Sequence, residues 1–376
     1  MSARKIVISI NAAWNVVNFR ARLVRGLVAA GYEVIAVAPP DEHVERLRAL
    51  GIDYVPIAMD KQGVSPLRDL GLFWSYWRIL RRLGAGVFLG YTAKPNIYGS
   101  LAARAAGMEV INNVSGLGTA FIRGGWLRRV VETLYRLAFR ASATIFFQNA
   151  DDRALFLSRR IVGPERARLL PGSGIDLAHF QPAPPPTGSG PFRFLLVARM
   201  LRDKGVLEYV EAARRLRPRW PDVRFQLLGP VDAANRTAIS RAMVEEWVRE
   251  GSVEWLGAVD DVRPLLAAAD CVVLPSYREG LPRTLLEAAA TARPLIATDV
   301  PGCRDIVRDG VNGLLCAVAD AGSLAAAMER MLEAGPDQRA AWGASARAIA
   351  EAEYSDEVVL ARYLAAIEEA LQSAER

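Results

Sequence analysis

A chain of 376 residues is too long for one ordinary domain and suits two. Hydrophobic residues make up 52% of the chain and charged residues 23%, which excludes a disordered protein and fits α/β domains with substantial cores. The net charge of +6 favours anionic partners such as nucleotide phosphates, a lipid surface or nucleic acid.

The first half of the chain alternates short apolar runs with helical patterns at βαβ spacing. We expect strands over residues 5–10, 33–38, 52–57, 87–89, 109–112 and 143–147. Residues 11–19 are expected to be a loop that leads into a helix ending near Gly31. Further helices are expected over residues 41–50, 66–83, 94–106, 126–140 and 151–159. No Gly-x-Gly-x-x-Gly follows the first strand, so a nicotinamide or flavin site finds no support.

A segment rich in proline and glycine, residues 181–191, interrupts this alternation and reads as a linker. Beyond it we expect strands over residues 192–197, 223–228, 253–256, 271–275, 294–298 and 313–316. The helices of this half are expected over residues 206–216, 233–249, 262–268, 282–292, 322–332, 337–350 and 356–373. The sequence therefore predicts a first domain over residues 1–180 and a second over residues 192–354, each a doubly wound α/β sheet.

The stretch that follows the fourth strand of the second domain carries two carboxylates with distinct positions. Glu279 lies on the strand-to-helix loop beside Gly280 and Pro282, and Glu287 lies one to two turns inside a helix that is otherwise almost wholly apolar. A buried carboxylate needs hydrogen bonds, and the two hydroxyls of a ribose would supply them. The alternative is that Glu287 pairs with Arg283 one turn earlier and that Glu279 is a solvated loop residue.

Two cations follow the first strand of the second domain. Arg199 and Lys204 flank the start of the next helix, an arrangement that suits a diphosphate. A solvated basic loop in a basic protein is the alternative. With only His43 and His179 in the chain, a histidine-rich metal site has little to build on, and we expect no metal.

The run Glu-Gly-Leu-Pro to Leu-Glu-Ala over residues 279–288, with the strand after it, resembles the Glu-x7-Glu signature of retaining glycosyltransferases of the GT-B fold, family 4. The resemblance covers nearly the whole chain and is most specific over residues 195–316. It implies an α/β architecture of two doubly wound Rossmann-like domains facing across a cleft. The last helix, within residues 355–376, is implied to pack back on the first domain. The reaction is implied to retain the configuration of a UDP-sugar donor and to use neither metal nor cofactor.

The resemblance also implies roles for the donor side. Glu279, Arg199 and Lys204 are the implied catalytic residues, because the two cations would neutralise the charge that grows on the β-phosphate as the nucleotide leaves. Glu287 is implied to hold the ribose. The other implied donor contacts lie mostly on glycine-containing loops: Gly280, Leu281, Pro282, Gly257, Val259 and Gly302.

The first domain is implied to bind the acceptor. Three polar loops after its expected strands supply the candidate acceptor-binding residues Asn15, Arg20, Thr92, Lys94, Asn96, Ser115 and Gly116. These loops resemble the branch of the family that extends polyprenyl-diphosphate-linked oligosaccharides, such as the N-acetylgalactosaminyltransferases of bacterial protein N-glycosylation. The chain departs from many family members in having no histidine near residues 113–116, so an acid–base scheme that relies on that histidine has no residue here.

Two expected helices, residues 66–83 and 126–140, are amphipathic and basic. Packing against a sheet explains such stripes, and a membrane-surface role requires exposed tryptophan and arginine together. No run reaches membrane-spanning length, and Cys271, Cys303 and Cys316 show no disulfide or metal spacing, which favours a reducing compartment. We therefore expect a cytoplasmic protein that is peripheral at the inner face of the cell membrane.

Together these features predict a hexosyltransferase that moves an N-acetylhexosamine from a UDP-sugar to a polyprenyl-diphosphate-linked saccharide in cell-surface glycan or glycoprotein biosynthesis. One alternative is a nucleotide-sugar 2-epimerase on the same architecture, which would need carboxylates and histidines that the first-domain loops lack. Another is a non-catalytic binder of sugar nucleotides or nucleic acid. We expect no nucleic acid partner, because the aromatic residues are scattered or helical rather than clustered on a sheet face. The transferred sugar, the linkage and the base stay open.

Overall fold

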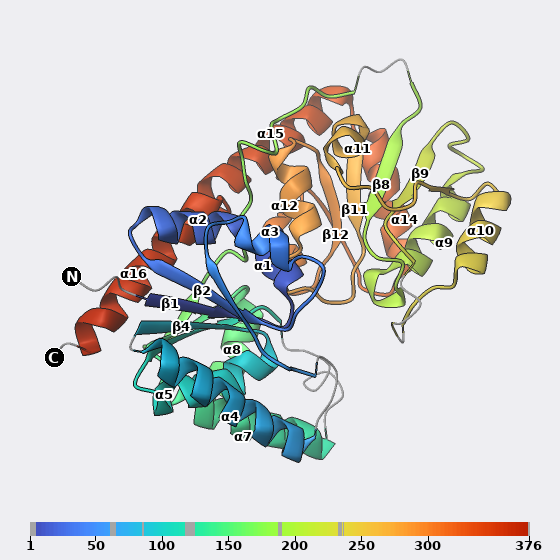
Figure 1. Ribbon diagram of the computed structural model, residues 1–376. Helices are drawn as coiled ribbons and strands as arrows, with labels where there is room; N and C mark the ends of the chain where they lie inside the picture. The colour runs from blue at the N-terminus through green and yellow to red at the C-terminus, as the bar shows by residue number, and fades with distance from the viewer. Residues whose placement is uncertain are drawn as a thin grey trace. The chain divides into compact units, whose positions relative to one another are not determined.

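The computed structural model describes residues 5–60, 65–84, 86–116, 125–186, 190–231, 235 and 237–374, with the side chains of residues 125–127 left out. The chain forms two compact units (Figure 1). Unit 1 comprises Met1–Gly174 and Asp356–Arg376, and unit 2 comprises Ile175–Ser355. The division falls before the expected boundary at residue 180, because Ile175 is buried in the core of unit 2 and forms a bridge with Ser355.

The sheet of unit 1 is parallel throughout and has the order β3-β2-β1-β4-β5-β6-β7. Its strands are β1 Lys5–Ser9, β2 Glu33–Ala38, β3 Asp53–Pro56, β4 Gly86–Tyr91, β5 Glu109–Val114, β6 Thr144–Phe147 and β7 Ala167–Leu169. Successive residues face opposite sides, so Ile6 and Ile8 enter one core and Val7 enters another. Both faces are buried, which explains the continuous apolar runs. The short strand β7 was not predicted.

Helices cover both faces of this sheet (Figure 1). One face carries α1 Ala13–Phe19, α2 Ala21–Ala29, α3 Val44–Arg48 and α16 Asp356–Ala374. The other carries α4 Pro66–Leu83, the π-helical turn η1 Pro95–Gly99, α5 Ser100–Ala105, α7 Gly125–Phe139 and α8 Ala150–Ser158. The prediction of a loop over residues 11–19 was wrong. Ala13 and Val16 are buried one turn apart, so packing against the core stabilises α1.

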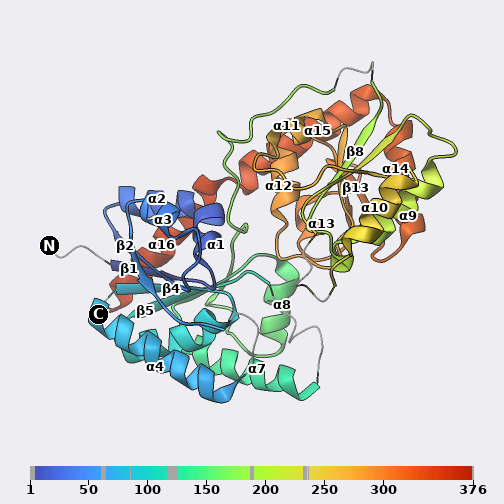
Figure 2. The same cartoon turned by 45° about the vertical axis from the view of Figure 1, so that its right-hand side comes forward.

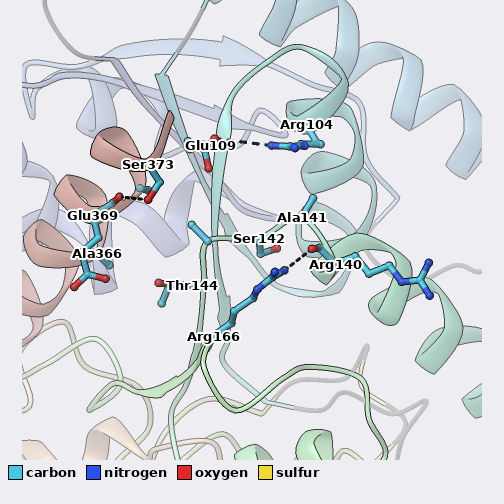
Figure 3. A pocket seen from close by; sticks show the side chains of 12 residues that line it. Arg104, Glu109, Arg140, Ala141, Ser142, Thr144, Arg166, Ala366, Glu369 and Ser373 are labelled. Carbon is cyan, nitrogen blue, oxygen red and sulfur yellow. Dashed lines mark hydrogen bonds and ion pairs between the residues drawn. The ribbon is translucent and has the colours of Figure 1, made fainter. Parts of the chain in front are cut away.

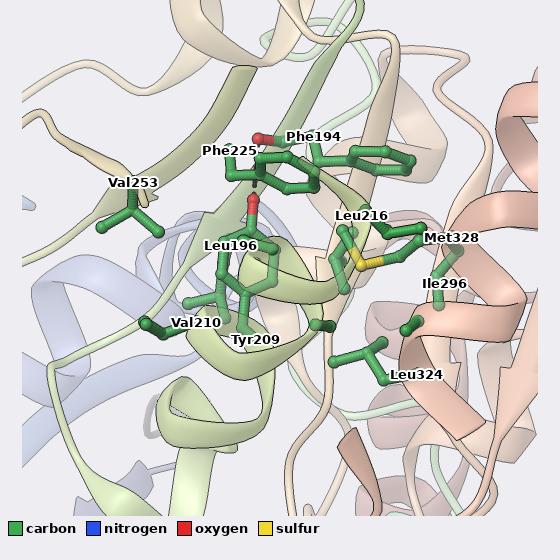
Figure 4. Close-up of a cluster of buried hydrophobic side chains, with 14 of the residues drawn as sticks. Phe194, Leu196, Tyr209, Val210, Leu216, Phe225, Val253, Ile296, Leu324 and Met328 are labelled. Atoms are coloured by element: carbon green, nitrogen blue, oxygen red, sulfur yellow. Dashed lines mark hydrogen bonds between the residues drawn. The ribbon is translucent and has the colours of Figure 1, made fainter. Parts of the chain in front are cut away.

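The sheet of unit 2 is also parallel, in the order β10-β9-β8-β11-β12-β13. Its strands are β8 Arg193–Val197, β9 Arg224–Leu228, β10 Glu254–Trp255, β11 Cys271–Leu274, β12 Leu295–Thr298 and β13 Gly313–Cys316. One core packs this sheet against α9 Val206–Leu216, α10 Arg241–Arg249 and α14 Ala321–Glu333. Figure 4 shows part of it, where Phe194 and Phe225 stack above Tyr209 of α9, whose hydroxyl donates to the Phe194 carbonyl.

The opposite face of this sheet packs against α11 Arg263–Ala268, α12 Arg283–Ala290, α13 Cys303–Ile306 and α15 Pro336–Glu353 (Figure 2). The helix expected over residues 233–249 begins later, at Arg241, because Ser240 caps it by accepting a hydrogen bond from the amide of Met243. Residues 233, 234 and 236 of that prediction lie outside the described chain. The four-residue helix α13 was not predicted.

Each sheet reverses the direction of its winding at one place. The reversal lies between β1 and β4 in unit 1, and between β8 and β11 in unit 2. The expectation of doubly wound α/β units is confirmed. Ligands of such sheets bind outside the carboxyl ends of the strands at this reversal, so the loops after β1, β4, β8 and β11 are where a site is expected.

Candidate functional site

The loops after β8 and β11 bring two of the expected catalytic residues into contact. Lys204 ends a short 3-10 turn, η2 Arg202–Lys204, and its Nζ lies 2.5 Å from Oε1 of Glu279. The hydroxyl of Ser276 donates to the same oxygen over 2.5 Å. Arg199 is exposed on the β8 loop. A cation and a carboxylate that are far apart in the sequence therefore meet at the reversal of the sheet.

The backbone around this ion pair is closely packed at two glycines. Gly302 has a φ of +82°, and a Cβ there would lie 2.6 Å from the carbonyl oxygen of Gly280. The amide of Glu279 donates to the carbonyl of Pro301 over 3.3 Å. Gly205, with a φ of +71°, lies against the carbonyl of Pro275 in the same way. These positions require glycine, since only a missing side chain permits both the positive φ and the close approach.

The remaining donor candidates occupy neighbouring positions. Pro282 is the N-cap of α12 rather than part of its first turn, and Leu281 packs partly against the core beneath. Gly257 accepts a hydrogen bond from the amide of Gly229 over 2.7 Å, which places it beside the end of β9. Val259 is exposed two residues further on. These two residues therefore belong to the adjoining loop rather than to the loop of Glu279.

Glu287 lies within α12, whose first turn is fixed to β8 by the hydroxyl of Thr284 donating to the carbonyl of Val197 over 3.2 Å. Nε of Arg283 donates to Oε1 of Glu287 over 2.8 Å. Burial raises the pKa of Glu287, and Arg283 opposes that shift, with a smaller contribution from His179. The pairing with Arg283 is therefore present. A carboxylate has acceptor capacity beyond one hydrogen bond, so a ribose would not have to displace Arg283.

On the acceptor side, Asn96 belongs to a buried hydrogen-bond network beneath the strand ends of unit 1. Its Nδ2 donates to the carbonyl of Asn113 over 2.8 Å, and its Oδ1 accepts from Asn112 over 2.9 Å. Asn112 also donates to Ser100 and accepts from Ser142. Because Asn96 is almost completely buried, it shapes the loop after β4 rather than presenting its amide at the surface.

Lys94 is paired with a carboxylate that the sequence did not single out. Its Nζ lies 2.7 Å from Oδ1 of Asp69 in α4, and the hydroxyl of Tyr98 donates to the other oxygen over 3.1 Å. Asp69 is buried, and it lies in a helix that otherwise looked like an ordinary packing helix. The positive charge of Lys94 is therefore compensated inside unit 1.

The other acceptor candidates lie at the carboxyl ends of the strands. Thr92 follows β4 directly and has a φ of +62°, a strained conformation for a β-branched residue. Asn15 donates to the side chain of Asn11 over 2.9 Å. Ser115 and Gly116 follow β5, and residues 117–119 of the same predicted loop lie outside the described chain. Arg20 lies between α1 and α2, where it contacts Tyr91, the last residue of β4.

A cavity of about 310 Å³ opens at the opposite edge of the unit 1 sheet, where β5 and β6 begin (Figure 3). Arg104 lies 3.9 Å from Glu109, and Arg166 donates to the carbonyl of Arg140. Glu369 of α16 completes one side and pairs with Arg168. This cavity lies away from the carboxyl ends of the strands, and Arg104, Glu109, Arg166 and Glu369 each have a partner.

No group of three or more His, Cys, Asp or Glu side chains in the described chain is arranged to hold a metal ion. Within the same residues, no helix combines the length and the apolar composition needed to cross a bilayer.

Two family models match the chain, one in each unit. A glycosyl transferase 4-like domain matches residues 16–172, and glycosyl transferases group 1 matches residues 191–334. The chain is 27% identical to the N,N'-diacetylbacillosaminyl-diphospho-undecaprenol alpha-1,3-N-acetylgalactosaminyltransferase of Campylobacter jejuni, over 94% of this chain and 96% of that protein. It is 24% identical to an Escherichia coli UDP-Gal:alpha-D-GlcNAc-diphosphoundecaprenol alpha-1,3-galactosyltransferase, over 72% and 73% of the two chains.

Solved structures agree with these matches in fold. A glycosyltransferase from Rickettsia africae superposes with a TM-score of 0.79 at 16% identity, covering 99% of each chain. Anabaena HepE in complex with UDP and glucose superposes with a TM-score of 0.76 at 18% identity, covering 97% of this chain and 99% of that one. The matches give the 2-epimerase alternative no support.

Proposed function

We propose that this chain, a glycosyltransferase of the GT-B fold with a glycosyl transferase 4-like domain and a group 1 domain, transfers a sugar from a UDP-sugar to a polyprenyl-diphosphate-linked saccharide. The observation that supports the donor assignment is the contact between Lys204 and Glu279 at the β8–β11 reversal, with Arg199 on the same β8 loop as Lys204. The acceptor half rests on the likeness to two relatives whose names specify undecaprenyl-diphosphate-linked acceptors. An N-acetylhexosamine is the donor sugar we propose, after the first of these relatives.

The two cations have a definite task in this reaction. When the bond between the anomeric carbon and the β-phosphate breaks, negative charge grows on the leaving nucleotide. Arg199 and Lys204 stabilise that charge more strongly in the transition state than in the ground state. Lys204 has three N–H donors, so its bond to Glu279 leaves donors for phosphate oxygens. Glu279 in turn fixes the position of the ammonium group.

Retention of configuration, metal independence and the lack of a cofactor are parts of the same proposal. Side-chain cations at the diphosphate take the role that a divalent ion plays in other transferases. Activity is therefore expected to survive EDTA and to need no added cofactor. An α-linked donor is expected to give an α-linked product, and a β-linked product in the proton NMR spectrum would contradict retention.

We also propose that unit 1 contacts the inner face of the cell membrane through α4. This helix exposes Leu67, Leu70 and Trp74, which lie three and four positions apart and so share one face. Leu67 is 84% exposed and Trp74 is 48% exposed. Arg78 is exposed on the same helix, and so is Arg68, whose Nη1 lies 3.6 Å from Asp60. Exposed apolar and cationic side chains together suit an anionic lipid surface, and a polyprenyl acceptor resides there.

The second basic helix, α7, suits this role less well. Arg128 lies 3.5 Å from Glu132, and Arg136 donates to the carbonyls of Arg159 and Arg160. Val130 and Leu137 of α7 are exposed, but the side chain of Trp126 and all of Arg123 lie outside the described residues.

Flotation with liposomes of varied anionic-lipid content tests the α4 surface. The double variant Leu70→Ser with Trp74→Ser is expected to lose binding, and Arg128→Glu with Arg129→Glu is the comparison. Equal flotation of the α4 variant and the unaltered protein would reject the α4 surface.

A donor screen tests the proposed function. Nucleotide sugars are added one at a time and the melting temperature is recorded, since a ligand that binds only the folded protein stabilises it by mass action. UDP-N-acetylhexosamines are expected to raise the melting temperature, and Lys204→Ala is expected to abolish the rise. No rise with any UDP-sugar would contradict the donor assignment.

A further inference from the structure

A buried arginine lies at the reversal of the unit 1 sheet. Arg20, between α1 and α2, is 8% exposed. Its guanidinium carbon lies 4.1 Å from the centre of the Tyr91 ring, and Nη1 donates to the carbonyl of Asn15 over 3.3 Å. No carboxylate of the described chain forms an ion pair with it. A buried cation whose partners are the uncharged Tyr91 side chain and one carbonyl is costly unless an anion binds to it.

The ring beneath Arg20 is held from three elements. Tyr91 ends β4 and is 1% exposed, and its ring lies 6.4 Å from that of Tyr363 in α16. The hydroxyl of Tyr363 accepts a hydrogen bond from Nδ2 of Asn113 in β5 over 3.0 Å. α16 joins this cluster from the far end of the sequence. The platform on which Arg20 lies is therefore fixed, which orients the guanidinium before any ligand arrives.

The cluster also holds an unused donor. The hydroxyl of Tyr91 is buried and makes no hydrogen bond of ordinary geometry with the described residues, although Arg20 and Tyr363 lie nearby. Buried hydroxyls in native proteins nearly always have a partner. This hydroxyl can donate to an acceptor, because burial raises the pKa of the phenol and keeps its proton in place.

Lys94, the other cation at the carboxyl ends of these strands, differs from Arg20 because its charge is compensated. Lys94 forms its ion pair with Asp69, so its charge is balanced within unit 1. Thr92, directly after Tyr91, has a strained φ of +62°. Strain of this kind is found where the surrounding structure fixes a backbone for ligand contact. An uncompensated cation, an unused hydroxyl donor and a strained strand end therefore occur together at the place where such sheets bind ligands.

We propose that Arg20, resting on Tyr91, binds a phosphate of the acceptor's diphosphate, with the Tyr91 hydroxyl as a second donor. The proposal rests on the function proposed above, in which the acceptor carries a diphosphate. A guanidinium presents paired N–H groups that match phosphate oxygens, and stacking on an aromatic ring leaves its in-plane donors free to bind. Arg20 thereby favours acceptors that carry the diphosphate over saccharides that lack it.

The kinetic test compares two acceptors that share one saccharide, an alkyl-diphosphate-linked form and an alkyl glycoside without phosphate. Arg20→Gln is expected to raise KM for the diphosphate acceptor by about 10- to 100-fold, and to leave KM for the alkyl glycoside and for the donor nearly unchanged. Arg20→Lys is expected to recover part of the loss, and Tyr91→Phe to lose less. Arg25→Gln, an exposed arginine of α2, is the matched control and is expected to change nothing.

A binding measurement keeps the test independent of turnover. Calorimetric titration with the alkyl-diphosphate-linked saccharide is expected to show a similar loss of affinity in Arg20→Gln, with donor binding intact. An equal rise of KM for both acceptors, or unchanged affinity in the titration, would overturn the role of Arg20. If the unaltered protein binds the diphosphate acceptor through Arg20 and yet transfers no sugar, the proposed function fails and the anion site stands. Unchanged donor affinity and melting temperature in Arg20→Lys show that the fold is intact.

Discussion

Replacing Glu287 by alanine tests which of two roles the residue has: the ion pair with Arg283 or the proposed binding of a ribose. The ion pair joins residues four positions apart on one helix, with 2.8 Å between Nε of Arg283 and Oε1 of Glu287. Pairs of this kind contribute about 0.3–0.5 kcal/mol, and Arg283 is 29% exposed, so water can solvate it when its partner is removed. Hydrogen bonds from a ribose to a carboxylate contribute about 1.5–3 kcal/mol. That range corresponds to roughly a 10- to 150-fold weaker affinity for UDP.

The assay measures the affinity of UDP and of 2′,3′-dideoxyuridine diphosphate for the unaltered protein and for Glu287→Ala. UDP is expected to bind the variant about 10- to 150-fold more weakly, whereas the dideoxy nucleotide is expected to bind both proteins equally. Arg283→Ala removes the same ion pair and keeps the carboxylate, so it is the matched control and is expected to retain UDP. Equal losses for the two nucleotides, or a lower melting temperature with unchanged affinity, would refute the ribose assignment.

Three further predictions concern the same unit. Lys204→Ala is expected to lower kcat by roughly 10²-fold or more in steady-state transfer assays, and Arg202→Ala in the same short turn is the control; near-normal turnover in Lys204→Ala would remove the diphosphate assignment. Because burial raises the pKa of Glu287 and a ribose would bind its ionised form, UDP affinity is expected to fall as the pH drops through that pKa. Titrations from pH 8 to pH 5 check this against Glu287→Gln, which is expected to show only the protonation of the phosphate. Gly302→Ala places a Cβ 2.6 Å from the carbonyl of Gly280 at a positive φ, so it is expected to displace the Glu279 loop and lower kcat; wild-type kinetics would show that the loop tolerates the shift.

The sequence predicted the layers of the fold because each buried parallel strand is a short apolar run followed by a turn signal. The prediction failed where an element is short or where contacts with distant parts of the chain determine it. β7 Ala167–Leu169 has three residues with an arginine among them, so it shows no apolar run. The prediction of a loop at α1 was wrong, because asparagines surround the apolar residues that pack this helix against the core. The predicted start of α10 is too early, because the helix begins only after Ser240, a residue type that commonly caps helices.

In the candidate site, too, the positions that depend on local sequence could be predicted and the long-range contacts could not. The strand-end positions of Arg199, Lys204 and Glu279 followed from local patterns, and the structure has these residues on the β8 and β11 loops. The partners of Lys94 and Asn113 in unit 1 could not be predicted in this way. Asp69 is 25 positions from Lys94, and Tyr363 is 250 positions from Asn113. Local periodicity carries no information about such pairs, so the compensation of Lys94 and the buried support beneath Arg20 required the folded chain.

The most direct test of the proposed function is the product of one incubation. The protein is mixed with a UDP-N-acetylhexosamine and a polyprenyl-diphosphate-linked saccharide, and the lipid fraction is analysed by mass spectrometry. The account predicts that the acceptor gains the mass of one N-acetylhexosamine residue, that UDP is released in equal amount, and that Lys204→Ala abolishes both. Release of free sugar and UDP with no change in the mass of the acceptor, for every UDP-sugar tried, would contradict it.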